Sequence, residues 1–315
     1  MSVILTVTLN PAWDVTYPVA ALVPGSTHRV ARVTGQAGGK GINVARVLKR
    51  MGQPVLATGV LCGDTGRAIA ADLEAAGVPA AFADGGDHSR TRTTVAVVET
   101  GAAGQATVFN EPGPDALDWP AILGQLRPLI ARSALVVLSG SLPPALPTDA
   151  YATLIEAARA DGVPTILDSD GVALTAALAA RPDLVKPNRD ELARATGTED
   201  LGRGARALLD AGAAAVVVSD GPAGLLAVTP DEVVRARPPA VRAVNPTGAG
   251  DAAVAALATG LLERLPWPDA LRRAVAWSAA SVLEPVAGAI SPAEAGRLAD
   301  LVDVDDPSQG SEPSC

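Results

Sequence analysis

The chain has few residues of the kinds that build disulfide-bonded, zinc-binding or membrane-spanning proteins. Two cysteines and two histidines among 315 residues are too few for a disulfide framework or a structural zinc site. No apolar run approaches the roughly 20 residues that a membrane helix needs. The opening stretch MSVILTVTLN has no basic region ahead of its apolar run, unlike a signal peptide. We therefore expect a cytoplasmic protein with no membrane partner.

Basic residues are also in the minority. The formal net charge is -9 and no basic stretch stands out, so nucleic acid is not an expected partner. Only three lysines occur, Lys40, Lys49 and Lys186. Because arginine takes the other basic positions, each retained lysine is a candidate for a specific role. Hydrophobic residues make up 48% of the chain, which predicts a folded protein rather than a disordered one.

What is present is an alternation of short apolar runs with helical stretches. Such runs are typical of strands buried on both faces of a parallel sheet, with helices covering both faces. The pattern predicts a three-layer α/β/α fold around a mainly parallel sheet. The expected strands are residues 3–9, 55–60, 134–138, 165–167, 184–185 and 214–218. The expected helices are residues 41–51, 65–76, 148–161, 188–195, 201–211, 248–263, 267–283 and 291–302.

Two segments interrupt the alternation, and a tail follows it. Residues 15–34 and 92–109 are predicted to be exposed antiparallel strands, the second with a turn at 101–104. We expect them to form a small sheet that acts as a lid over the ligand end of the main sheet. Residues 1–302 would then be a single domain. The acidic tail at 303–315 is expected to be disordered.

The strongest local motif is Asn245-Pro-Thr-Gly-Ala-Gly-Asp251. A tight turn here would open a helix and direct backbone N–H groups at a ligand. The start of a helix adds partial positive charge, so the turn suits a phosphate or the charge of a transition state. Asp251 could then accept a proton from a substrate hydroxyl. The alternatives are an ordinary glycine-rich cap and a dinucleotide fingerprint, which here lacks a clear preceding strand.

A second glycine-rich turn is Ala37-Gly-Gly-Lys-Gly-Ile-Asn43. It lacks the first glycine and the Ser or Thr of a Walker A loop. It still opens a helix with free backbone N–H groups, and Lys40 and Asn43 could reach a polyol or a phosphate. A plain helix start explains the same residues equally well.

Other polar residues follow predicted strands, whose carboxyl ends face the ligand crevice of a parallel sheet. In Lys186-Pro-Asn188-Arg-Asp-Glu191, the amide and carboxylate oxygens of Asn188 and Glu191 suit Mg²⁺ held largely through water. The same two residues could form a capping box. Ser219-Asp-Gly221-Pro-Ala-Gly224 could contact the phosphates of a nucleotide or simply be a hairpin turn.

The remaining candidates lie at the ligand end of the predicted sheet or in the predicted lid. Asp14 and Ser139 follow or end predicted strands, and a carboxylate there can bind sugar hydroxyls. Arg29 and Arg92 lie in the two lid segments, where a guanidinium could hold a phosphate. Either arginine could equally be a solvated charge.

Taken together, these segments resemble the PfkB (ribokinase-like) family of carbohydrate kinases, nearly end to end. The two signature regions of that family are similar to residues 37–43 with the following helix and to residues 245–258. Thr8-Leu-Asn-Pro-Ala-Trp-Asp14, Ser139-Gly-Ser-Leu-Pro143 and Lys186-Pro-Asn188 resemble the subgroup that phosphorylates ketohexose phosphates. That subgroup comprises tagatose-6-phosphate kinase, 1-phosphofructokinase and the minor 6-phosphofructokinase.

The resemblance implies ATP and Mg²⁺ as cofactors and a role for each matching residue. Asp251 matches the catalytic base, beside an anion hole at Gly248, Ala249 and Gly250. The motif that positions Mg²⁺ matches Asn188 and Glu191. Nucleotide contacts match Lys186, Ser219, Gly221, Gly224 and Thr247. Substrate contacts match Asp14, Arg29, Gly38, Gly39, Lys40, Asn43, Arg92 and Ser139, with Arg92 expected to hold the phosphate of the sugar.

Three departures from the subgroup bear on the substrate. Residues 106–110 lack the arginine that the minor 6-phosphofructokinase carries there, and Asp170 and Asp220 replace a small residue and a hydrophobic one. The implied activity is ATP-dependent phosphotransfer to a primary hydroxyl of a ketohexose phosphate, with tagatose 6-phosphate first and fructose 1-phosphate second. The exposed lid edge predicts a homodimer. A non-catalytic sugar or nucleotide sensor is the alternative from another class, and the presence of Asp251 counts against it.

Overall fold

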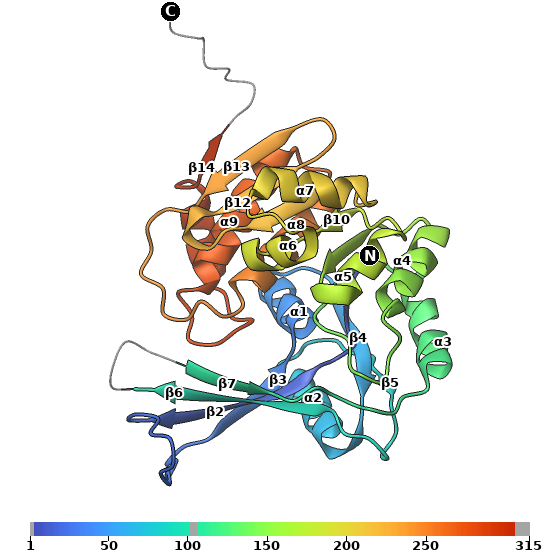
Figure 1. Ribbon diagram of the computed structural model, residues 1–315. Coiled ribbons are helices and arrows are strands. Elements are labelled where there is room, and N and C mark those ends of the chain that lie inside the picture. Colours follow the sequence, from blue (N-terminus) through green and yellow to red (C-terminus); the bar gives the residue numbers. More distant parts are fainter. Residues whose placement is uncertain (1–2, 101–105, 306–315) are drawn as a thin grey trace, which may run out of the picture.

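A ten-stranded sheet forms the centre of the computed structural model, which describes residues 3–100 and 106–305 (Figure 1). The order across the sheet is β14 (Asp303–Asp305), β13 (Val233–Arg237), β12 (Leu225–Val228), β11 (Val216–Ser219), β10 (Leu184–Val185), β9 (Thr165–Asp168), β8 (Leu135–Ser139), β1 (Ile4–Thr8), β4 (Val55–Leu61) and β5 (Ala83–Asp84). The pairs from β5 to β11 are parallel. The three pairs from β11 to β14 are antiparallel.

Helices cover both faces of this sheet, as the apolar runs of the strands require. In β8, Leu135 and Val137 join one core and Val136 and Leu138 join the other, because side chains alternate along a strand. The first core is closed by α1 (Lys40–Arg50), α2 (Gly63–Ala75), α8 (Ala249–Glu263), α9 (Trp267–Ser281) and α10 (Pro292–Ala299). The second is closed by α3 (Trp119–Ile130), α4 (Ala150–Ala160), α5 (Gly171–Leu178), α6 (Arg189–Thr196) and α7 (Leu201–Asp210). The predicted three-layer α/β/α fold is confirmed.

A separate four-stranded sheet extends to one side of the main sheet, at the lower left in Figure 1. Its order is β3 (Thr34–Gly38), β2 (Ala12–Val19), β6 (Arg92–Glu99) and β7 (Ala106–Asn110). The chain passes directly from β3 into α1 through Gly39. The small sheet is therefore joined to the first helix of the core at the glycine-rich turn.

Helix α8 is buried from Asp251 to Gly260 and has no polar face. A helix that is apolar all round belongs in an interior. Its alanines leave little side-chain volume, so α1 and α9 can pack closely against it; the Cβ of Ala270 in α9 would lie 3.3 Å from a Cβ placed on Gly260. This packing fixes the position of the first turn of α8, where the candidate base lies.

Several details differ from the sequence prediction. The small sheet is not purely antiparallel, because β2 and β6 pair in parallel. Only the ends of the segment 15–34 form strands, in β2 and β3. Residues 303–305, predicted to be disordered, form β14 on β13, whereas residues 306–315 and the predicted turn at 101–104 lie outside the described residues. Within residues 3–100 and 106–305, no helix has both the length and the apolar character to cross a bilayer.

Candidate active site

The turn before α8 is kept open by glycine. Gly248 has a φ of 90°, in the left-handed region that glycine adopts readily. A Cβ at Gly248 would also lie only 3.1 Å from the Cβ of Ala287. The side chain of Asn245 accepts a 2.9 Å hydrogen bond from the N–H of Thr247, which closes the turn. The first N–H groups of α8, including that of Gly250, have no acceptor within the helix and can bind an anion.

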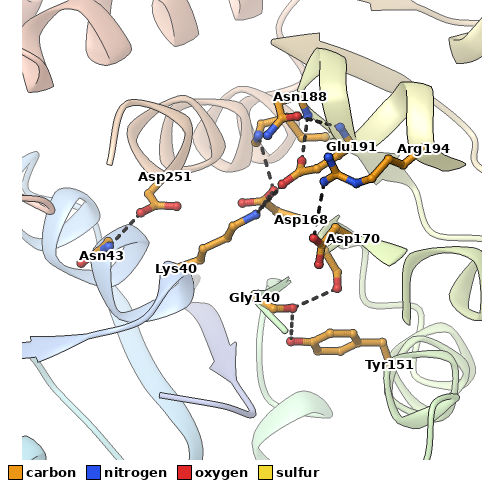
Figure 2. Close-up of polar contacts among 12 residues, drawn as sticks. Lys40, Asn43, Gly140, Tyr151, Asp168, Asp170, Asn188, Glu191, Arg194 and Asp251 are labelled. Atoms are coloured by element: carbon orange, nitrogen blue, oxygen red, sulfur yellow. Dashed lines mark hydrogen bonds and ion pairs between the residues drawn. The ribbon is translucent and has the colours of Figure 1, made fainter. Parts of the chain in front are cut away.

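Asp251 lies in the first turn of α8, and its side chain is buried. Its Oδ2 accepts a 2.8 Å hydrogen bond from Nδ2 of Asn43 in α1 (Figure 2). Burial, and secondly the charge of Asp168, raise the pKa of Asp251 to about 6, while Asn43 and the nearby lysines oppose that rise. Such a carboxyl group is deprotonated at neutral pH yet takes up a proton readily, as a general base must.

Two lysines and two carboxylates meet at the carboxyl ends of β9 and β10. Oδ1 of Asp168 lies 3.4 Å from Nζ of Lys186 and 3.4 Å from Nζ of Lys40. Nζ of Lys40 also lies 3.2 Å from Oε1 of Glu191. Figure 2 shows Lys40, Asp168 and Glu191 converging from α1, β9 and α6, with Asp251 nearby. We call these four residues the charge network.

Asn188 and Glu191 form the capping box that the sequence left open as one of two roles. Oδ1 of Asn188 accepts the N–H of Glu191, and Oε2 of Glu191 accepts the N–H of Asn188, both at 2.8 Å. Each residue uses one side-chain oxygen for the cap, and each of these oxygens accepts one hydrogen bond from a backbone N–H. Oε1 of Glu191 faces Lys40 instead. Oxygen donors of this kind suit Mg²⁺, so the local chemistry fits the predicted metal role.

A cleft of about 670 Å³ begins at Asn188 and is lined by the β11–β12 turn, residues from the segment 238–246, and helices α8 and α9. Its lining includes Asn188, Ser219, Gly221, Gly224, Pro246 and Gly250. Gly221 begins a short 3₁₀ turn between the antiparallel strands β11 and β12, so the hairpin interpretation of residues 219–224 is confirmed. A Cβ on Gly224 would lie 2.0 Å from the carbonyl oxygen of Ala236, and glycine is therefore required for the turn to pack on β13.

The two unexpected acids each have an arginine beside them. Asp220 accepts two hydrogen bonds from Arg189, at 2.6 and 2.7 Å, which connects the β11–β12 turn to the start of α6. Asp170 lies 3.8 Å from Arg194. The sequence alone gives no physical reason for an acid at either position. These two ion pairs supply one.

Asp14 on β2 and Arg92 on β6 are diagonal neighbours in the small sheet, because Asp14 pairs with Thr94 and Arg92 with Ala12. Burial raises the pKa of Asp14 to about 6, against the opposing effects of Arg92 and Thr94. A Cβ on Gly38 would lie only 1.8 Å from Oδ2 of Asp14, so the carboxylate can occupy this position only because residue 38 is glycine. Nε of Arg92 donates to the carbonyl oxygen of Asn10 at 3.1 Å, which fixes the guanidinium at the junction of the two sheets.

Buried polar atoms without a hydrogen-bond partner gather near this junction. Within the part of the chain that the structure describes, they include Thr8 Oγ1, Asn10 Oδ1, Asn43 Oδ1 and Ser139 Oγ. The adjacent loop is held firmly, because the carbonyl oxygen of Gly140 accepts hydrogen bonds from Tyr151 and Ser169 (Figure 2). Unsatisfied buried polar groups are costly, so these atoms are candidates for hydrogen bonds with a ligand.

The structure brings most of the predicted residues to one edge of the main sheet, with two differences. Lys40 was predicted to contact the sugar phosphate, but its ammonium group lies between Asp168 and Glu191. Arg29 lies exposed in the loop between β2 and β3, and makes no hydrogen bond or ion pair with the described residues. Asp168 was missed as a site residue, although it follows a predicted buried strand just as Asn188 does.

A second hollow, of about 640 Å³, lies along α2 and β5 and contains none of the predicted residues. Its lining combines apolar residues with scattered charges, among them Arg67 and Asp87, which pair with each other at 2.7 Å. Several predicted residues thus line the cleft at α8, and none lines this second hollow.

Comparison with known proteins places this geometry in a family. A family model described as pfkB family carbohydrate kinase matches residues 7–294. Phosphofructokinase-2 from Escherichia coli, solved in complex with potassium, is 31% identical over 96% of this chain and 99% of that chain, with a TM-score of 0.88. A possible 1-phosphofructokinase from Thermotoga maritima shares the fold at 23% identity, over 96% and 99% of the two chains, with a TM-score of 0.83. Arabidopsis thaliana ribokinase, complexed with ribose and ATP, shares it at 22% identity, over 95% and 98%, with a TM-score of 0.78.

Proposed function

Because the chain belongs to the pfkB family of carbohydrate kinases and is a sugar kinase, we propose that it phosphorylates a primary hydroxyl of a ketohexose phosphate with ATP. Tagatose 6-phosphate is the first candidate and fructose 1-phosphate the second. One observation supports the proposal above all. Asp251 is bonded to Asn43 on the sugar side, while its neighbour Gly250 lines the cleft on the nucleotide side.

In the proposed reaction, the oxygen of the primary hydroxyl attacks the γ-phosphorus of ATP in line with the departing ADP oxygen. Asp251 accepts the hydroxyl proton as the new O–P bond forms and the bond to ADP breaks. The N–H groups at the start of α8 stabilise the negative charge on the transferred phosphoryl oxygens. Asn43 holds the carboxylate in place through its 2.8 Å hydrogen bond, so the base is oriented before substrate arrives.

Residues on the other side of the cleft would hold the nucleotide and its metal. Bound Mg²⁺ would neutralise charge on the phosphates, with Asn188 and Glu191 as the residues that position it. Within the described ranges no group of three or more His, Cys, Asp or Glu side chains could bind a metal, so protein carboxylates would share it with water and phosphate oxygens. Lys186 lies next to the turn before α8, because its Nζ is 3.5 Å from the position that a Cβ on Gly250 would take.

The sugar phosphate would lie under the small sheet. Asp14 would accept hydrogen bonds from sugar hydroxyls, and Ser139 and Asn43 offer further polar atoms that lack partners. Arg92, half-buried beside Asp14, would hold the phosphate of the sugar. Asn110 is the only polar residue of the last lid strand near it, with Oδ1 3.5 Å from the Arg92 guanidinium. Strands β6 and β7 carry a single arginine, Arg92, and β7 has none, which weakens an assignment of fructose 6-phosphate.

The test is a panel of sugars in an assay that couples ADP release to a colour change. The panel contains tagatose 6-phosphate, fructose 1-phosphate, fructose 6-phosphate, the parent ketohexoses and ribose. The proposal predicts the highest kcat/KM for tagatose 6-phosphate and a marked loss when the phosphate is missing. Preference for an unphosphorylated sugar would contradict the substrate class. Binding of a sugar phosphate with no ADP release would favour the sensor.

We also propose a homodimer formed through the small sheet. Strand β7 is exposed along its whole length, and Val108 and Phe109 are 50% and 58% exposed. An open strand edge with large apolar side chains favours pairing with a second copy. Light scattering after size-exclusion chromatography should give a dimer, and Phe109→Lys should shift the protein toward monomer. A monomeric native protein at micromolar concentration would contradict this assembly.

A further inference from the structure

The positive and negative charges of the charge network are equal in number. Its two ammonium groups, on Lys40 and Lys186, face its two carboxylates, on Asp168 and Glu191, at 3.2 to 3.4 Å. Asp251 adds one negative charge, but its oxygen is bonded to Asn43 and not to either lysine. The carboxylates are therefore neutralised by the protein itself when no nucleotide is present.

The members of the network differ in their freedom to move. The side chains of Asp168, Lys186 and Glu191 are 1%, 3% and 8% exposed, whereas that of Lys40 is 37% exposed. Glu191 is held further by its cap on Asn188. Lys40 stands in the first turn of α1 and reaches the carboxylates with a long flexible chain. Only Lys40 could leave the network without disturbing the packed core.

The position of the Lys40 ammonium group matters because it contacts the oxygen that the cap leaves available. Oε2 of Glu191 is occupied by the backbone of Asn188, and Oε1 faces Nζ of Lys40. Burial alone would lower the pKa of Lys40, but the carboxylates of Asp168, Glu191 and Asp251 outweigh it and raise the pKa above its ordinary value. The ammonium group itself, 3.2 Å from Oε1 of Glu191 and 3.4 Å from Oδ1 of Asp168, acts as a cation at this point.

We propose that Lys40 is a tethered counter-ion, which occupies the carboxylates of Asp168 and Glu191 in the empty enzyme and so opposes binding of a divalent cation that arrives without a nucleotide. A bare divalent cation would have to displace or face the ammonium group at close range, and like charges repel strongly in a partly buried site. Triphosphate oxygens supply the negative charge that the ammonium group can contact instead. The inference rests on the proposed function only in taking these carboxylates as those nearest the nucleotide.

The test measures Mn²⁺ binding to the nucleotide-free protein by calorimetry and by electron paramagnetic resonance. Lys40→Met should bind Mn²⁺ at least about tenfold more tightly than the native protein, because one opposing charge is gone. Lys49→Met is the matched control, since Lys49 is exposed at the other end of the same helix and its loss changes the net charge equally. Lys40→Arg retains the charge and should stay within about threefold of the native affinity.

Unchanged or weaker Mn²⁺ binding by Lys40→Met would overturn the proposal, as would equal tightening by Lys49→Met. If Lys40→Met does not fold, Lys40→Gln replaces it with the same expectation. None of these readouts uses a sugar, so they stay informative even if the substrate panel fails.

Discussion

Asn43 and Asp251 are 208 residues apart in sequence, yet Nδ2 of Asn43 donates a 2.8 Å hydrogen bond to Oδ2 of Asp251. The bond joins the first turn of α1, which continues from the small sheet, to the first turn of α8, which borders the cleft. The two glycine-rich motifs of the sequence therefore meet at a single carboxyl group. The predictions below test what that carboxyl group and its neighbours do.

The pH dependence of kcat/KM should report the ionisation of Asp251. Its pKa is raised to about 6 by burial, and the base is active only when deprotonated. Activity should therefore fall as pH decreases through about 6 and reach a plateau above about pH 7. Asp14, also with a pKa of about 6, would steepen the fall. A profile measured from about pH 5 to pH 8 checks this.

The sugar phosphate needs its own control in that experiment. A phosphomonoester loses its second proton near pH 6, so the ionisation of the free substrate is followed by phosphorus NMR without enzyme. An acidic fall in kcat/KM that remains after this correction supports the raised pKa of Asp251. A corrected profile that stays flat would contradict it.

Replacing the base should stabilise the folded protein. The pKa of Asp251 is higher in the folded state, about 6, than its ordinary value of 3.8. Between these values the folded protein keeps a proton that the unfolded chain has lost, so the free energy of unfolding decreases as pH rises. Asp251→Asn removes this cost and can still accept the hydrogen bond from Asn43. The variant should be more stable by about 1 to 3 kcal/mol near neutral pH.

Denaturant unfolding of both proteins at about pH 7.5 and about pH 4.5 measures this difference. The gain should shrink at the lower pH, where native Asp251 is protonated. A variant that is less stable than the native protein at the higher pH would show that the carboxylate is held favourably.

Gly38→Ala should damage sugar binding specifically. The new Cβ would lie 1.8 Å from Oδ2 of Asp14, so the carboxylate must move by more than an ångström. Displacement of that size in a positioned group costs about a hundredfold, and we expect KM for the sugar phosphate to rise at least about tenfold with KM for ATP unchanged. Gly124→Ala is the matched control, because nothing lies within 4 Å of its new Cβ. Equal effects on the two KM values would indicate general misfolding instead.

Arg92→Ala should weaken binding of phosphorylated sugars only. Loss of a guanidinium that holds a phosphate removes a charge-assisted contact, and KM should rise about 10- to 100-fold while kcat changes little. Arg90→Ala is the control, since Arg90 is exposed and pairs with Glu111 at 2.7 Å. Steady-state kinetics with tagatose 6-phosphate and with tagatose separate the two cases. An unchanged KM for the phosphorylated sugar would place its phosphate elsewhere.

Much of the fold and the site could be predicted because both follow from local patterns. Continuous apolar runs predicted the strands that are buried between the helix layers. The rule that parallel strands end at one edge of the sheet predicted that Asp14, Ser139 and Asn188 lie close together. The short hairpin strands β12 and β13 were missed because the turn at 219–224 has the same sequence signature with or without them. Helix α3 was missed because it contains Pro120 and Pro128; the first lies in the opening turn, where proline is tolerated.

The remainder depends on contacts that a local pattern does not encode. Lys40 could have reached either a sugar or a phosphate, and its pairing with Glu191 across 151 residues is decided by the packing of α1 against β1, β4 and α8. β14 has the acidic composition of a disordered tail, but Arg237 on β13 binds both Asp303 and Asp305 and offsets half of their negative charge. Asp168 was the one omission that the strand-end rule could have prevented.

The most direct test of the whole account is a single-turnover measurement on Asp251→Asn with saturating ATP and sugar phosphate. If Asp251 accepts the hydroxyl proton, the rate of phosphoryl transfer should fall about a thousandfold or more, with the dissociation constant for ATP within about threefold of the native value. A transfer rate within about tenfold of native would contradict the assignment of Asp251 as the base.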